Sequence, residues 1–209
     1  MHNVELIHVT PNAEQLIAYM ARVSNPSNQN NPNYQQLIKY LITHKHWSPF
    51  EMVNMCVKIE TTRSVAAQIL RHRSFSFQEY SQRYAEVTQA PAPLHLRRQD
   101  TKNRQNSIDD LNDELTYAYK FRMKQLFDQS YKLYQDMIDD GIAKECARDV
   151  LPLSTPTTLY MNGTLRSWLH YTDLRSANGT QLEHKQVADH CKSLIQQQFP
   201  TVYTAMWCK

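Results

Sequence analysis

RHRSFSFQEYSQRY, residues 71–84, is the stretch that decides how this chain is interpreted. It places arginines, a histidine, an acid, serines and aromatic side chains within one short segment. The apolar pattern before it predicts a helix that ends near His72, so Gln68 and Arg71, three residues apart, share a helix face. Arg71 and Arg73 are two residues apart and point away from each other, so we expect them to serve different groups.

If the second half of this stretch is extended, its side chains alternate between two faces. Its two faces are Glu79, Ser81 and Arg83 on one side, and Tyr80, Gln82 and Tyr84 on the other. The first face offers an acceptor, a hydroxyl and a guanidinium, which suits a phosphorylated ligand that forms several hydrogen bonds. An alternative is equally compatible with the composition: the arginines and His72 are a solvated helix end whose cations complement the helix dipole.

The rest of the chain fits an ordinary globular protein. Its 209 residues are 41% hydrophobic and 21% charged, which is enough for a real core and predicts one domain over residues 1–209. No apolar run approaches the length of a membrane span and the first residues lack a signal-peptide pattern, so we expect a cytoplasmic protein. The net charge of +3 is too mild for a nucleic-acid coat, although it allows a local anion site.

Glycine is scarce, and this limits how a nucleotide can be bound. The only three glycines are Gly141, Gly163 and Gly179, and none belongs to a GxGxxG turn or a P-loop. A bound nucleotide must therefore be held mainly by side chains and helix N-termini.

Neither the cysteines nor the histidines have the spacing of metal ligands. We expect reduced, mostly buried thiols at Cys56, Cys146, Cys191 and Cys208. The histidines form no HExxH or comparable pair, so we expect no metal site from His44, His46, His170, His184 and His190.

Hydrophobic periodicity predicts an α+β fold, a single domain in which a small mixed or antiparallel sheet is flanked by long helices. Strands are expected over residues 4–9, 52–60 and 157–161. Helices are expected over residues 14–23, 33–44, 64–72 (capped by Thr61 or Thr62), 108–139, 143–150, 165–175 and 181–199. Residues 90–107 are expected to form an exposed, mobile loop that carries Arg97, Arg98, Lys102 and Arg104.

Beyond these physical arguments, the central stretch resembles a known family. Arg71-His72-Arg73, followed after residues 74–80 by Ser81, matches the signature of the flavin-dependent thymidylate synthases. The match is extended by Gln68, Ser76, Glu79, Arg83 and Tyr84. Further blocks keep the family's order along nearly the whole chain: residues 21–24, 46–51, 147–152, 165–167 and 174–175, and then Gln181 and Glu183.

The resemblance implies a homotetramer that converts dUMP to dTMP, with flavin sites shared between subunits. Reduced FAD, regenerated by NADPH, would supply the hydride, and methylenetetrahydrofolate the one-carbon unit. By similarity, FAD would contact Ser48, Arg71, His72, Arg73, Glu79, Arg166 and His170. By similarity, dUMP would be held by Gln68, Arg71, Glu79, Ser81, Arg83, Arg148 and Arg175.

The resemblance also implies roles for some of these side chains. Arg175 is the expected catalytic residue, because a guanidinium against the uracil edge stabilises negative charge that develops on the ring. Arg83 and Arg148 suit the phosphate, where a guanidinium can donate two hydrogen bonds. Ser81 is expected to position the substrate, because no partner base for a nucleophile is identified.

Some positions depart from the family pattern, and contacts there are not carried over. They are Met52, Gln78, Gln82 and residues 178–180. The aromatic side chains of the long helix are expected to pack in the core or between subunits: Tyr117, Phe121, Tyr131 and Tyr134. The rival function is a non-catalytic nucleotide- or RNA-binding module, which would use arginines on phosphates and tyrosines for stacking and would bind no flavin.

Overall fold

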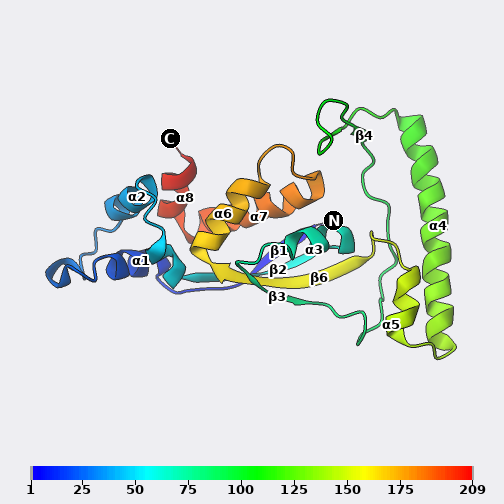
Figure 1. The fold of residues 1–209 in the computed structure, drawn as a ribbon, viewed down its shortest axis with the longest axis horizontal. Coiled ribbons are helices and arrows are strands. Elements are labelled where there is room, and N and C mark those ends of the chain that lie inside the picture. Colours follow the sequence, from blue (N-terminus) through cyan, green and yellow to red (C-terminus); the bar gives the residue numbers. More distant parts are fainter. Residues whose placement is uncertain (1, 209) are drawn as a thin grey trace.

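A four-stranded antiparallel sheet lies at the centre of the protein (Figure 1). The structure is a computed structural model that describes residues 2–208. The strand order is β1 (Asn3–Val9), β2 (Asn54–Thr62), β6 (Pro156–Thr164) and β3 (Ser76–Glu79). All neighbouring strands run antiparallel, and β1 is interrupted by an irregularity between Leu6 and His8.

The two faces of the sheet differ in polarity, as the alternating sequence of β2 predicts. Met55, Val57 and Ile59 are fully buried on one face. On the other face Lys58 forms ion pairs with Glu5 and Glu60. One face therefore carries the core while the other carries polar side chains, as is common for antiparallel sheets.

Helices cover the apolar face and extend beyond both ends of the sheet. Their bounds are α1 Ala13–Ala21, α2 Gln35–Thr43, α3 Arg63–Ile69, α4 Asp113–Asp139, α5 Lys144–Ala147, α6 Leu165–Arg175, α7 Leu182–Gln198 and α8 Pro200–Trp207. Short 3-10 helices span Pro26–Asn28 (η1), Ser48–Met52 (η2) and Arg148–Val150 (η3), and a small hairpin joins β4 (Arg98–Gln99) to β5 (Ser107–Ile108). In Figure 1, α6 and α7 lie over the sheet, whereas α4 stands at the far end with α5.

Trp168 of α6 organises the centre of the core. Its indole Nε1 donates to the backbone oxygen of Met55 at 2.8 Å, which ties α6 to β2. The ring of Phe75 lies edge-on to Trp168, with 4.8 Å between ring centroids. Phe75 also rests against Gly163 of β6, where a side chain would occupy the same space. The segment that carries Arg71–Arg73 is thus anchored to the core two residues after its last arginine.

The long helix α4 joins the body through a small second core. This core contains Val87, Tyr134 and Ala147. The Tyr134 hydroxyl accepts a hydrogen bond from the Val87 amide at 2.9 Å, and the Tyr131 hydroxyl donates to the Val87 carbonyl at 3.1 Å. The remainder of α4 leaves apolar side chains exposed at Leu115, Tyr117, Tyr119, Phe121, Leu126 and Leu133.

The predicted α+β class, with a small antiparallel sheet and long flanking helices, is confirmed. Several local predictions are wrong. The long helix begins at Asp113, where the Asn112 side chain accepts from the Leu115 amide at 2.7 Å, and residue 108 belongs to β5. Thr62 occupies the N-cap of α3, but its side chain forms no capping bond. Cys56 and Cys191 are buried as expected, whereas Cys146 and Cys208 are exposed.

The segment after Glu79 is not extended, which was the condition for Glu79, Ser81 and Arg83 to share one face. Strand β3 ends at Glu79, and the chain then turns, with the amides of Tyr84 and Ala85 donating to the Ser81 carbonyl. Glu79, Ser81 and Arg83 therefore do not form one strand face.

Candidate active site

The first group of predicted site residues meets between the end of α3 and the end of α6. Arg175 is the last residue of α6, and its Nε donates to Nε2 of His72 at 2.9 Å. His72 accepts this bond as a neutral imidazole, because partial burial, the charge of Arg175 and His170 lower its pKa to about 4. The His72 ring therefore fixes the plane of the Arg175 guanidinium.

The terminal nitrogens of Arg175 are left for a ligand. The side chain is half-buried, and among residues 2–208 no acceptor bonds to its two terminal nitrogens. A guanidinium that is held at Nε keeps its outer edge as a planar pair of donors. This edge can donate two parallel hydrogen bonds to a carbonyl or an anion.

Gln68 lies beside this pair, and its amide is oriented by partners on both sides. Its Nε2 donates to Oε1 of Gln181 at 2.6 Å, and its Oε1 lies 3.3 Å from Nδ1 of His184. The other ring nitrogen of His184 lies 3.2 Å from the Tyr171 hydroxyl. Burial is the main cause that lowers the pKa of His184 to about 3 and raises the pKa of Tyr171 well above its usual range, so both side chains are neutral.

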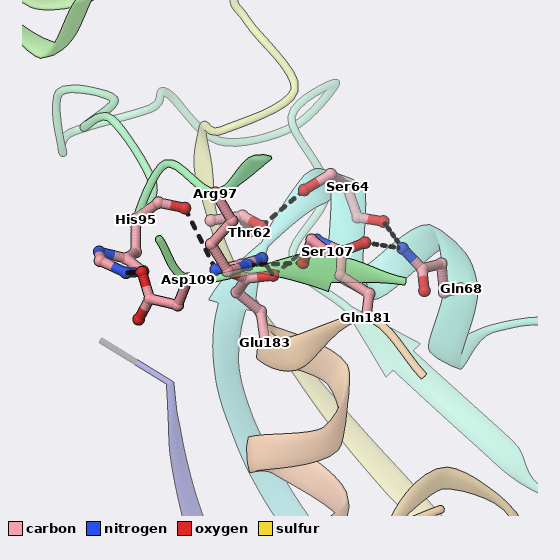
Figure 2. Close-up of polar contacts among 9 residues, drawn as sticks. All are labelled: Thr62, Ser64, Gln68, His95, Arg97, Ser107, Asp109, Gln181 and Glu183. Atoms are coloured by element: carbon pink, nitrogen blue, oxygen red, sulfur yellow. Dashed lines mark hydrogen bonds and ion pairs between the residues drawn. The ribbon is translucent and has the colours of Figure 1, made fainter. Parts of the chain in front are cut away.

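An inward-facing ion pair lies at the far end of the same chain of contacts (Figure 2). Arg97 donates to both carboxylate oxygens of Glu183, at 2.7 and 3.0 Å, and the two side chains are only 11% and 5% exposed. Nε2 of Gln181 donates to the same carboxylate at 2.8 Å. The expectation that Arg97 lies in a mobile, solvated loop is therefore wrong. Glu183 is 86 residues away in the chain, so no local pattern indicates this pairing.

A second group of predicted residues lines a cavity of about 690 Å³. Its walls are Trp47, Glu51, Ser74, Thr164, Arg166, Ser167, Leu169, His170, Asp173 and Met206. Arg166 forms an ion pair with Glu51 at the surface. Ser48 lies in η2 beside this wall, and Arg71 and Arg73 are exposed just before Ser74. The structure thus gathers cationic and hydroxyl side chains around a space large enough for a cofactor.

The remaining predicted residues lie toward the sheet edge and α5. The Glu79 carboxylate accepts from Arg63 and from the Thr157 hydroxyl. Arg83 donates to Glu145 at 3.0 Å in an exposed ion pair. Arg148 is half-buried in η3, and none of residues 2–208 accepts a hydrogen bond from its side chain. No hydrogen bond or ion pair within residues 2–208 links this group to Arg175.

Comparison with known proteins shows to which family the chain belongs. Residues 5–201 match the model of the family described as thymidylate synthase complementing protein. A protein of Paramecium bursaria Chlorella virus 1, described as a probable flavin-dependent thymidylate synthase, is 53% identical over 195 residues, which are 93% of this chain and 90% of the viral protein. The chain belongs to the flavin-dependent thymidylate synthase family.

Other members and a solved structure agree with this assignment. A flavin-dependent thymidylate synthase of Synechocystis is 49% identical over 193 residues, which are 92% of this chain and 89% of that protein. The crystal structure of the UMP/dUMP methylase PolB from Streptomyces cacaoi, bound with 5-Br dUMP, has a TM-score of 0.87 and 27% identity. That match covers 100% of this chain and 95% of PolB.

The family expected from the sequence is thereby confirmed, together with the class of flavin-dependent methyltransferase that acts in dTMP synthesis. Residues 2–208 contain no group of three or more histidine, cysteine or acidic side chains arranged for a metal ion. In the same part of the thymidylate synthase chain, no helix has both the length and the apolar character needed to cross a membrane.

Proposed function

We propose that this family member methylates dUMP to dTMP, with methylenetetrahydrofolate as one-carbon donor and with FAD, reduced by NADPH, as its cofactor. The observation that carries the proposal is the cluster of Gln68, His72 and Arg175. In this cluster a guanidinium is held at Nε and presents its free edge to a ligand. The relatives named above, and the nucleotide bound to PolB, support dUMP as that ligand.

Arg175 has the role of polarising the pyrimidine. Its two terminal nitrogens can donate to a uracil carbonyl and stabilise negative charge that develops on the ring. His72 holds the guanidinium plane and remains neutral, so it does not add a competing charge beside the base. Arg175 therefore acts as a preorganised donor, and no side chain of this cluster needs to form a covalent bond.

The nucleotide phosphate is assigned to Arg83 and Arg148, and Ser81 positions the substrate through its hydroxyl. Arg83 is paired with Glu145 at an exposed site, and such pairs contribute little stability, so a phosphate can displace the carboxylate. Arg148 has no acceptor among residues 2–208 and can bind an anion without losing an existing contact. Arg71 and Glu79 complete the dUMP contacts expected from the family.

The side chains around the second cavity fit FAD. A cofactor with a pyrophosphate needs cationic or amide donors, and this chain lacks the glycine-rich turn that usually supplies them. Arg71, Arg73 and Arg166 supply charge instead, and Ser48 and His170 add polar contacts. The other two FAD contacts expected from the family lie outside the cavity wall: His72 is bonded to Arg175, and Glu79 accepts from Arg63 and Thr157. When bound and reduced, FAD supplies the hydride for the reaction.

We further propose that residues 1–209 act as one catalytic domain that assembles as a homotetramer in the cytoplasm. The separation of the substrate residues into groups within one chain supports sites that are completed by a neighbouring subunit. The exposed apolar side chains of α4 offer a surface for that contact, because such patches on soluble proteins commonly mark interfaces. The cysteines of the described chain are free thiols, as is usual in a reducing compartment.

The test of this function is flavin binding. Purified protein should show the visible absorbance of an oxidised flavin or acquire it on titration with FAD. Arg73→Ala should weaken FAD binding by about 1.5 to 3 kcal/mol, the range for a hydrogen bond to a charged group, whereas Lys132→Ala on α4 should leave it unchanged. Protein that binds dUMP or RNA but takes up no FAD would refute the enzyme and favour a nucleotide-binding module.

A further inference from the structure

The contacts around Gln68 form a chain in which each donor and acceptor is fixed. It runs from Arg97 through Glu183, Gln181 and Gln68 to His184, and each link is at most 3.3 Å long. Figure 2 shows the first part of this chain, from Arg97 to the start of α7 and on to Gln68 in α3. A side-chain amide accepts only at its oxygen and donates only from its NH2 group, so its neighbours decide which of the two atoms faces them.

The ion pair determines the orientation at one end. An ionised carboxylate can only accept hydrogen bonds, so Gln181 must turn its NH2 group toward Glu183. Gln181 then presents its oxygen to Gln68, and Gln68 must donate from Nε2. Arg97 keeps Glu183 ionised: although burial raises the pKa of this carboxyl, hydrogen bonds from Arg97 and Gln181 lower it by more.

The other end of the chain agrees with this orientation. His184 is neutral, and because Oε1 of Gln68 can only accept, the ring carries its hydrogen on Nδ1. The Tyr171 hydroxyl, which keeps its proton, then donates to Nε2. Nδ1 of His184 donates to Oε1 of Gln68. The second hydrogen on Nε2 of Gln68 points to the Ser64 carbonyl at 3.5 Å. Both amide hydrogens of Gln68 are therefore directed at protein acceptors, and only an acceptor lone pair on Oε1 remains.

We infer that the buried pair Arg97–Glu183 makes Gln68 a hydrogen-bond acceptor toward the nucleotide and so selects ligands that offer a donor there. The inference rests on the proposed function, in which Gln68 contacts dUMP. Arg97 and Glu183 are positioning residues, because they act on the ligand only through Gln181 and Gln68.

Only two groups of dUMP can donate a hydrogen bond to Oε1 of Gln68. The uracil ring donates only from N3–H, and the sugar donates only from its 3′-hydroxyl, whereas the carbonyls and the phosphate accept. Cytosine has no hydrogen on N3, so dCMP loses the first donor and keeps the second. The 3′-deoxy analogue of dUMP loses the second and keeps the first. A site with a fixed acceptor rejects an analogue that lacks the matching donor.

The experiment measures dissociation constants of dUMP, dCMP and the 3′-deoxy analogue by calorimetry, with the FAD-loaded protein and with Glu183→Gln. An amide at position 183 can donate to Gln181 and reverse both glutamines. We compare the dissociation constant of each analogue with that of dUMP. In Glu183→Gln the ratio for dCMP, or the ratio for the 3′-deoxy analogue, should fall by about tenfold, and the ratio that falls identifies the donor. Asp189→Asn, which alters a partly exposed pair with Lys185 on the same helix, should leave both ratios unchanged.

A second substitution separates orientation from general damage. In the double variant Glu183→Gln with Gln181→Glu, the carboxylate moves from residue 183 to residue 181, which contacts Gln68 directly. Gln68 must then again donate from Nε2. The ratio of dissociation constants that falls in Glu183→Gln should return to its wild-type value. If Glu183→Gln does not fold, Gln181→Met removes the same link without disturbing the ion pair and should lower the same ratio.

The outcomes distinguish this inference from the proposed function. Wild-type protein that does not bind dUMP refutes the proposed function. If wild-type protein binds dUMP but neither Glu183→Gln nor Gln181→Met changes the ratios of dissociation constants, the orienting role is refuted. The proposed function is not affected by that result. Equal weakening of all three ligands likewise assigns the pair a purely structural role.

Discussion

Replacing Gly163 by alanine should destabilise the protein and disturb the arginine segment at the same time. A Cβ at position 163 would lie 2.4 and 2.7 Å from two carbons of the Phe75 ring, and real Cβ atoms do not approach carbon so closely. Phe75 cannot move away easily, because it is only 8% exposed and packs edge-on against Trp168. Overpacking of this kind typically costs about 1 to 3 kcal/mol, which for a chain of this size lowers the melting temperature by about 2 to 12 °C.

The assay is thermal unfolding followed by circular dichroism, with FAD titration on the folded variant. Because Phe75 is only two residues after Arg73, Gly163→Ala should also weaken FAD binding. Gly141→Ala is the control: it has no atom within 4 Å but a φ of +80°, so it should cost some stability through backbone strain and leave FAD binding unchanged. Phe75→Leu should partly rescue Gly163→Ala. A Gly163→Ala variant as stable as the wild type, or a double variant without rescue, would show that Phe75 does not fill the space beside Gly163.

Three further predictions test the chemistry, the pH dependence and the assembly. Arg175→Lys keeps a positive charge but loses the planar pair of guanidinium donors. Turnover at saturating dUMP, measured as tritium release from carbon 5, should therefore fall about 100-fold to 1000-fold. Near-normal turnover with poor dUMP binding would show that Arg175 only binds the substrate. The pKa values of His72 and His184 in the folded protein lie below the usual 6.5, so the unfolded chain binds more protons than the folded one below pH 6.5. The free energy of unfolding in urea should therefore fall as the pH drops from 6.5 toward about 4. His184→Gln should make this fall less steep, and an unchanged dependence on pH would contradict the prediction. Phe121→Glu on the exposed face of α4 should lower the mass in light scattering from about four times the chain mass of 24.6 kDa, and an unchanged assembly would place the interface elsewhere.

The sequence predicts the elements whose residues alternate or repeat strongly. Helix α6 has the predicted bounds, and Thr164 caps it by accepting from the Ser167 amide. Strand β2 is present but lies two residues further along the chain than predicted, at Asn54–Thr62. Helix α8 was not predicted, because Phe199 breaks the helical backbone after α7 and Pro200 starts a new, short helix. Whether the segment after Glu79 is extended could not be decided from the sequence, because a polar segment that alternates in sequence need not pair with a strand.

The site is only partly predictable for a physical reason. The family motif names Gln68, His72 and Arg175, and the structure brings these three together. The partners that orient them are set by tertiary contacts over long separations, such as His184 to Gln68 and Arg97 to Glu183. No local pattern in the loop of residues 90–107 distinguishes a buried arginine from a solvated one.

The most direct test of the central claim is product formation from dUMP. FAD-loaded protein is incubated with dUMP, methylenetetrahydrofolate and NADPH, and the nucleotides are separated by chromatography. We expect dTMP in the complete mixture and none when FAD, the folate or NADPH is omitted. A complete mixture in which flavin-loaded, dUMP-binding protein forms no dTMP would contradict it.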